Sequence, residues 1–240
     1  VFGRSTRQGF GGVRTGAVNV SSGSYALGGS AILGATSRTV SSPAFPGPGA
    51  AVLNGGSFSH SGGFANVAGA VTVETGGSYS LSGGTLNAAN ALAIAGPYVQ
   101  SFGTLSGAGT VSISGASSWS AGTMTGTGHT ILNGTLAISG TSAKDLTSNR
   151  VLELDNTTTW TGLGGLRVGT GASIQNNALF DAQNDQPISN PFGGSAAFDN
   201  TAAGTFRKSA GTGTTTFSGP VFTNTGAVDD STDPTATPAY

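Results

Sequence analysis

A pattern of two short strands around a glycine corner recurs along this chain, and its spacing restricts the folds that the chain can adopt. The clearest copy spans residues 71–86, where Val71-Thr72-Val73 and Tyr79-Ser80-Leu81 flank a Gly-Gly pair. Alternating apolar and small polar residues predict strands, and paired glycines predict turns. The last apolar residue of each copy's first strand recurs every 16–25 residues, with a mean of about 21. These anchors are Val73, Ile94, Ile113, Ile138, Leu154, Ile174, Phe198 and Phe222.

This period selects one fold class. A propeller blade needs about 40 residues, and Gly, Ser, Thr and Asn are poor helix formers, so propellers and helical repeats are excluded. We therefore predict an all-β chain folded as a parallel β-helix (β-solenoid) with about 20 residues per turn, the turns stacked about 4.8 Å apart. We expect the solenoid over residues 16–228, with a projecting Pro/Gly loop at 43–49. Residues 1–15 should form a basic arm or an irregular first turn, and residues 229–240 an acidic, proline-containing tail.

The composition excludes several classes of function. Charged residues make up 8% of the chain, against about 25% in an average soluble domain. The net charge of −1 argues against a nucleic-acid partner, since such binding depends on neutralising phosphates. The absence of cysteine excludes disulfides and thiolate metal sites. No apolar run is long enough to span a membrane as a helix.

An asparagine column supports the predicted register. Asn156, Asn176, Asn200 and Asn224 each lie two residues after an anchor. In stacked turns each amide could donate to one neighbour and accept from the other, forming a ladder. The alternative is that asparagine simply favours turns. The equal 24-residue spacing of the last two steps favours the ladder.

An aromatic column is the second predicted structural feature. Its members lie near the start of each copy's second strand: Tyr25, Phe58, Tyr79, Trp119, Trp160 and Phe180. Packing along the core is the favoured interpretation, because offset aromatic pairs contribute about 0.5–1.5 kcal/mol each. The alternative is an exposed stripe that binds carbohydrate or a surface.

Catalytic residues are sparse. Asp145, Glu153 and Asp155 lie near Lys144 and Arg150 and are the one candidate charged cluster, for which a solvated corner or an ion-pair patch is the favoured reading. Three further acids that could meet across a turn are Asp181, Asp185 and Asp199. The isolated His60 and His129 make no metal site. We therefore expect no enzymatic activity, no cofactor and no metal.

Two segments carry a family resemblance. Residues 103–128, GTLSGAGTVSISGASSWSAGTMTGTG, and 198–217, FDNTAAGTFRKSAGTGTTTF, resemble the Gly/Thr/Asn-rich repeats of secreted bacterial proteins. These include autotransporter passenger domains and filamentous-haemagglutinin-like adhesins. The resemblance implies a right-handed parallel β-helix, an extracellular or cell-surface location, and an adhesive or structural role. It carries over no functional residue, because these repeats share no catalytic motif.

The leading hypothesis is therefore an extracellular structural or adhesive solenoid, and the alternative is a solenoid that binds or degrades polysaccharide. Expected partners are other copies of the chain, a host or abiotic surface, and extracellular polysaccharide. Head-to-tail self-assembly is suggested by a basic start and an acidic finish. The residues concerned are Arg4, Arg7, Arg14, Asp229, Asp230 and Asp233.

Overall fold

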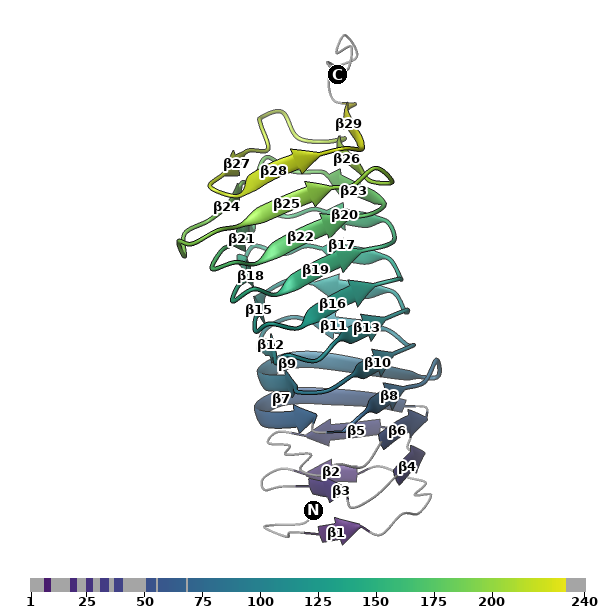
Figure 1. Cartoon of the computed structure of the whole chain (residues 1–240). Coiled ribbons are helices and arrows are strands. Elements are labelled where there is room, and N and C mark those ends of the chain that lie inside the picture. The colour runs from purple at the N-terminus through teal and green to yellow at the C-terminus, as the bar shows by residue number, and fades with distance from the viewer. Residues whose placement is uncertain are drawn as a thin grey trace. The chain divides into compact units, whose positions relative to one another are not determined.

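A computed structural model describes residues 57–67 and 69–231 with their side chains. Before them it describes the backbone of Gly56 and of the strands at 7–9, 18–20, 25–27, 31–34, 37–40 and 51–54. The chain divides into two compact units, Val1–Ser117 and Ser118–Tyr240. Every regular element in the described part is a β-strand (Figure 1).

Both units are parallel β-solenoids, as the repeat spacing predicts. Strands pair in parallel with strands about 22 residues away, over about 8 turns in all. A complete turn supplies three strands joined by corners, so each unit has three faces, each a parallel sheet. We call them the first, second and third faces, in the order in which the chain meets them within a turn.

Unit 1 contains the earlier turns. Its first face holds β4 (Ala31–Gly34), β6 (Ala51–Asn54), β8 (Val71–Val73), β10 (Leu92–Ile94) and β13 (Val111–Ile113). Its second face holds β2 (Val18–Val20), β5 (Ser37–Val40), the first parts of β7 (Gly56–Val67) and β9 (Gly77–Ala88), and β11 (Tyr98–Gln100). Its third face holds the later parts of β7 and β9, with β12 (Thr104–Ser106). β1 (Arg7–Gly9) pairs with β3 (Tyr25–Leu27).

Unit 2 repeats the arrangement. Its first face holds β16 (His129–Leu132), β19 (Val151–Leu154), β22 (Ser173–Asn176), β25 (Ala197–Asn200) and β28 (Val221–Asn224). Its second face holds β14 (Ser117–Trp119), β17 (Leu136–Ile138), β20 (Thr158–Trp160), β23 (Leu179–Ala182), β26 (Thr205–Lys208) and β29 (Ala227–Asp230). Its third face holds β15 (Gly122–Met124), β18 (Lys144–Leu146), β21 (Leu166–Val168), β24 (Ile188–Ser189) and β27 (Phe217–Ser218).

The long strands of unit 1 bend at their glycines. The sequence predicts a turn at Gly83-Gly84, but β9 continues through this pair from the second face to the third. Gly84 has a φ of +68°, a conformation that side chains with a Cβ rarely adopt. A Cβ there would also overlap the carbonyl oxygen of Gly63 in the preceding turn. Glycine is therefore needed for both the bend and the close approach of successive turns.

Alternation places the core. In β10 the side chains of Leu92 and Ile94 are buried while Ala93 between them is exposed. Successive side chains of a strand point to opposite faces of a sheet, so alternate residues enter the solenoid. Fully burying such a Leu or Ile contributes about 1.5–3 kcal/mol. Buried aliphatic and aromatic side chains therefore fill the interior, and the outward positions hold mainly short polar ones.

Two anchors of the predicted register are wrong. Ile138 lies in β17 on the second face, as the register partner of Trp160. On the first face of unit 2, the partner of Ile174 is Leu152 and not Leu154. These displacements explain the uneven predicted intervals, because the true period of this face is 22 residues from Val151 to Ser173.

The predicted boundaries meet the structure at several points. β1 lies inside the predicted arm at 1–15 and pairs with β3, so this segment includes a strand of unit 1. β29 ends at Asp230, two residues beyond the predicted limit of 228. The Pro/Gly loop at 43–49 and residues 232–240 lie outside the described residues.

Candidate functional site

Three of the four predicted asparagines form a ladder along unit 2. Asn176, Asn200 and Asn224 are register partners in three successive turns. Nδ2 of Asn176 donates to Oδ1 of Asn200, and Nδ2 of Asn200 donates to Oδ1 of Asn224, each across 2.7 Å. The same two donors also reach the carbonyl oxygens of Thr205 and Ala227 in the next turn. The amides therefore tie each turn to the next at the corner after the first face.

Asn156 does not belong to this ladder. The register partner of Asn176 in the preceding turn is Leu154. Asn156 lies two residues further on, where its Oδ1 accepts from the Thr157 amide and its Nδ2 donates to the carbonyl oxygen of Asn133. Its assignment was wrong because both Leu152 and Leu154 point inward, and the sequence alone could not tell which was the anchor.

The predicted aromatic column is divided into separate buried clusters. In unit 1, Phe58 stacks on Tyr79 at a centroid distance of 5.0 Å, and Tyr79 stacks on Tyr98 at 6.1 Å. Tyr98 continues the series as the register partner of Tyr79, and the sequence reading missed it. The side chain of Tyr25 lies outside the described residues.

In unit 2 the rings pack around the interior rather than in one file. Phe180 is the register partner of Thr158 and not of Trp160, and it meets the Trp160 ring edge-on at 6.1 Å. Phe180 also contacts Phe198 at 5.2 Å and Phe206 at 5.5 Å. Trp119 is likewise buried. Every described member of the predicted column is at most 3% exposed, so these rings do not form a surface stripe.

The acids proposed as a cluster lie on different faces. Asp145 is on β18 of the third face, whereas Glu153 is on β19 of the first face. Asp155 follows β19 and accepts a hydrogen bond of 2.7 Å from Nδ2 of Asn177. The other candidate trio is also divided, with Asp181 on β23 and Asp199 on β25. Neither trio therefore converges as a pair of catalytic carboxylates would.

Two of these acids pair with arginines in the next turn. Asp145 accepts from Nε and Nη2 of Arg167 across 2.6 and 2.7 Å. Asp181 accepts from Nε and Nη2 of Arg207 across 3.1 and 2.8 Å. The hydrogen bonds from Arg207 are the main reason that the pKa of Asp181 falls to about 2. Such two-point pairs fix the planes of both groups.

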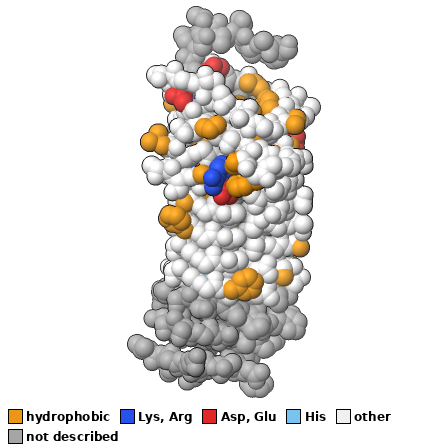
Figure 2. Space-filling view, turned by 90° about the vertical axis from the view of Figure 1, so that its left-hand side faces the viewer, with side chains coloured by type: hydrophobic (Ala, Val, Ile, Leu, Met, Phe, Trp, Pro, Cys, Tyr) orange, Lys and Arg blue, Asp and Glu red, His pale blue; other side chains and the backbone are white. Residues whose placement is uncertain are grey.

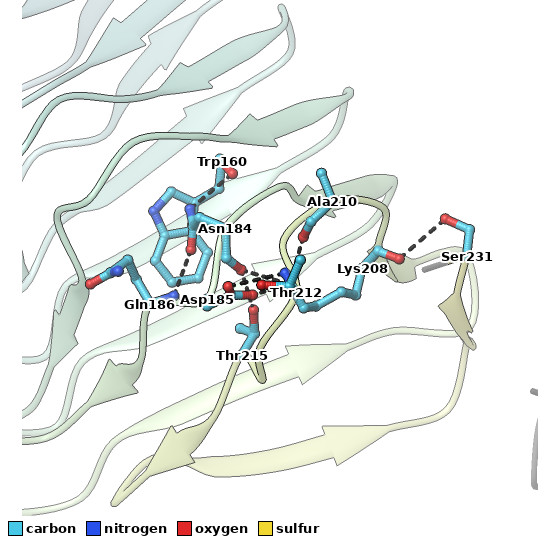
Figure 3. A network of polar contacts seen from close by, with 9 residues as sticks. All are labelled: Trp160, Asn184, Asp185, Gln186, Lys208, Ala210, Thr212, Thr215 and Ser231. Carbon is cyan, nitrogen blue, oxygen red and sulfur yellow. Dashed lines mark hydrogen bonds and ion pairs between the residues drawn. The ribbon is translucent and has the colours of Figure 1, made fainter. Parts of the chain in front are cut away.

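Lys208 anchors a corner of unit 2, as Figure 3 shows. Its ammonium donates to the carbonyl oxygens of Asn184 and Ala210 across 2.9 and 2.6 Å, and to Oδ1 of Asp185 across 2.8 Å. Thr215 donates to the same Asn184 oxygen. The bond from Lys208 also lowers the pKa of the Asp185 carboxyl. The network fastens the connection between β26 and β27 to the preceding turn.

Two cations are buried inside unit 2, which the sequence reading did not predict. It placed Lys144 and Arg150 beside the acids, yet both have no exposed surface. Arg150 donates from Nε to Oγ1 of Thr130 across 2.8 Å and from Nη1 to the Thr125 carbonyl across 3.0 Å. The only acceptor for Lys144 Nζ among the described residues is the Gly164 carbonyl, at 3.4 Å. Burial lowers the pKa of Lys144.

The two histidines remain apart. His60 is buried with Nδ1 3.2 Å from the Tyr79 hydroxyl, and burial lowers its pKa. His129 is an exposed residue at the start of β16. Within the described residues, no group of three or more His, Asp or Glu side chains could hold a metal ion. Nor does that part contain a helix capable of crossing a membrane.

The predicted assembly residues are described only in part. Asp229 and Asp230 are exposed on β29, and Asp229 is the register partner of Arg207. Arg4, Arg14 and Asp233, and the side chain of Arg7, lie outside the described residues.

Ionisable groups occupy little of the surface. Figure 2 shows one side of the molecule, where blue and red occur in small patches among white side chains and scattered orange ones. Comparison with models of known protein families, with curated proteins and with solved structures found no match. The fold therefore defines the chain as a β-solenoid repeat protein.

Proposed function

We propose that this solenoid is an extracellular structural or adhesive protein whose outer faces make contact with other molecules. The observation that carries the proposal is the contrast between its interior and its surface. Bulky side chains such as Trp160 and Phe180 are fully buried, while outward columns carry short residues such as Thr72, Ala93 and Ser112. Such faces offer a broad, even surface without long mobile side chains.

The charge distribution supports the same proposal. Unit 2 uses Asp145, Asp181 and Asp185 in ion pairs between turns, where they fasten the rod instead of facing a substrate. A surface of low net charge also favours association over repulsion. The resemblance to secreted adhesin repeats adds an extracellular location to the proposal.

An adhesion assay tests this function. Beads coated with the full chain should attach to glass, polystyrene and cultured cells more strongly than beads coated with an unrelated protein of similar size and charge. The competing hypothesis is tested on the same preparation by measuring reducing ends released from a set of polysaccharides. Cleavage that is lost in Asp145→Asn or Glu153→Gln would replace the proposal with an enzyme.

Head-to-tail self-assembly belongs to the same proposal. The described acids Asp229 and Asp230 are exposed on β29, and the first 73 residues contain arginines but no acid. Light scattering at low salt, where attraction between charges is least screened, should detect particles larger than the monomer. Reversing Asp229 and Asp230 to Lys should reduce them, and a monodisperse unmodified chain would rule out assembly without affecting adhesion.

A further inference from the structure

The third face of unit 1 presents two parallel columns of uncharged polar side chains. One column is Asn66, Asn87 and Ser106, in successive turns. Nδ2 of Asn87 donates to Oδ1 of Asn66 across 2.8 Å, and Oγ of Ser106 lies 3.4 Å from Oδ1 of Asn87. These contacts hold the amides in one plane along the stack, so the face offers donors and acceptors at fixed positions.

The other column begins with an exposed aromatic ring. Phe64 is the register partner of Thr85, which is in turn the partner of Thr104. The Phe64 side chain points outward and is 53% exposed. An exposed phenyl group costs free energy in water and usually marks an interface when polar groups surround it.

A second exposed ring lies two turns further along. Phe102 stands at the corner that leads into β12 and is 59% exposed. The matching corners of the two preceding turns are Gly62-Gly63 and Gly83-Gly84, so no side chain stands beside the ring on that side. Turns stack about 4.8 Å apart, which places the two rings about 10 Å apart along the axis. The hydroxyls of Thr85 and Thr104 lie between them.

This face carries no charge of its own. Among residues 57–117, Glu74 is the only charged side chain, and it lies at the corner between β8 and β9, away from the third face. His60, the other titratable side chain of the acid–base range, is buried. A polyanion or polycation would therefore lose hydration here without gaining an opposite charge.

We propose that the third face of unit 1 binds an extended, uncharged polysaccharide, with Phe64 and Phe102 as the two stacking platforms. The contact residues are Phe64, Asn66, Thr85, Asn87, Phe102 and Thr104. The inference rests on the proposed adhesive function and names the ligand class for it. It assigns polysaccharide binding to these rings rather than to the buried aromatic column.

The chemistry of a pyranose ring matches the arrangement. Its axial C–H groups form an apolar surface that loses water when it lies on a phenyl face. Its equatorial hydroxyls are donors and acceptors that the amide and hydroxyl columns can satisfy. An extended β-linked chain laid along the solenoid axis meets both rings, with polar contacts between them. A flat sheet face favours such a ribbon over a compact or branched sugar.

Binding of soluble oligosaccharides to the full chain tests the site. The probes are cellohexaose and chitohexaose, with oligogalacturonate of the same length as the charged comparison, each titrated by calorimetry. We expect both neutral hexaoses to bind and the oligogalacturonate to bind at least tenfold more weakly. Phe64→Ala and Phe102→Ala should each weaken neutral binding by about tenfold, because each removes the burial of one phenyl face.

Phe192→Ala is the matched control, since Phe192 is also an exposed phenyl group, at 37%, but belongs to unit 2. It should leave affinity unchanged, and unfolding midpoints should show that all variants fold. Absence of neutral binding, equal binding of the charged oligomer, or an unaffected Phe64→Ala/Phe102→Ala double variant would each overturn the site. Self-association lost in the double variant without any glycan binding would assign the face to another copy of the chain.

The same variants separate this inference from the proposed function. If the double variant loses glycan binding but its beads still adhere to glass and cells, adhesion uses other faces and the proposed function stands. If the unmodified chain binds glycans but its beads adhere nowhere, the site stands and the adhesive role fails.

Discussion

Asn176 and Asn200 occupy the same position in successive turns of unit 2 and are joined by an Nδ2–Oδ1 hydrogen bond of 2.7 Å. Asn200 is also the central member of the ladder, because its own Nδ2 donates to Asn224 and to the Ala227 carbonyl. An amide in this position holds three turns in register, which the hydrophobic interior alone would do less specifically.

Replacing the central amide should therefore destabilise unit 2. Asn200→Ala removes bonds on both sides of a residue that is 1% exposed and leaves buried partners unsatisfied. We expect the free energy of unfolding to fall by about 1–3 kcal/mol. Urea unfolding followed by tryptophan fluorescence measures it, since both tryptophans lie in unit 2.

Asn156→Ala is the matched control for that variant. Asn156 is exposed at a corner, so the same change should alter the free energy of unfolding by less than about 0.5 kcal/mol. Equal losses in the two variants would mean that turn preference, and not the ladder, accounts for these asparagines.

The buried tryptophan should contribute more than any single hydrogen bond. Trp160 has no exposed surface and packs against Phe180, so Trp160→Ala leaves a large cavity. We expect a loss of about 3–5 kcal/mol in the free energy of unfolding, measured by circular dichroism in urea. Leu163→Ala, three residues along and 69% exposed, should change little. A loss below about 1 kcal/mol for Trp160→Ala would contradict the observed packing.

The Asp181–Arg207 pair predicts a dependence on acid. The pKa of Asp181 is about 2 in the folded chain against an ordinary value of 3.8. Because folding lowers this pKa, the pair's contribution is complete above about pH 4 and disappears as the pH falls towards 2. Asp181→Asn should therefore lower the free energy of unfolding by about 2 kcal/mol at pH 7, and by much less at pH 2.

The comparison for Asp181 is an acid outside any ion pair. Asp199 points outward on the first face beside Gln175 and forms no salt bridge with a described residue. Asp199→Asn should change the unfolding free energy by less than about 0.5 kcal/mol at either pH. A pH-independent loss in Asp181→Asn would show that packing, and not charge, accounts for its effect.

The fold could be predicted from the sequence because the period and the alternation are both visible in it. What failed was the choice between equivalent residues two positions apart. Leu152 and Leu154 both point inward, so an anchor chosen by hydrophobicity can be displaced by two without changing the face. That displacement misplaced Asn156, while Asn176, Asn200 and Asn224 were placed together because their turns have equal length.

Contacts between turns were harder to predict because turn length varies. Asp145 and Arg167 are 22 residues apart, whereas Asp181 and Arg207 are 26 apart. An acid about one turn before an arginine is a usable signal, but it needs the register first. Exposed rings such as Phe102 gave no signal at all, since a corner residue has no partner in the alternation.

Lys144 shows how alternation can override charge. It lies one position before Asp145 and two before the buried Leu146, so the parity of β18 turns it inward. Its ammonium is fully buried with one long hydrogen bond, to the Gly164 carbonyl. Burying a charge with so little compensation costs free energy. Lys144→Met, which keeps the length and removes the charge, should therefore stabilise unit 2 at pH 7 by about 1 kcal/mol or more.

The pH dependence of this gain has a definite direction. Burial lowers the pKa of Lys144 from 10.5, so between the two values the unfolded chain binds a proton that the folded chain has lost. The free energy of unfolding then rises with pH through that window. The advantage of Lys144→Met should be complete below the window and shrink as the pH approaches 10.5. Urea unfolding at pH 7, 9 and 10 measures the difference.

Lys208→Met provides the matched comparison, because this ammonium is also nearly buried but is fully bonded. Its three bonds of 2.6–2.9 Å reach two carbonyl oxygens and the Asp185 carboxylate. Removing it leaves those oxygens without their donor, so we expect a loss of about 1–3 kcal/mol. The same substitution should therefore have opposite signs at the two lysines. A loss of stability in Lys144→Met at pH 7 would show that the aliphatic packing of Lys144 outweighs the cost of its buried charge.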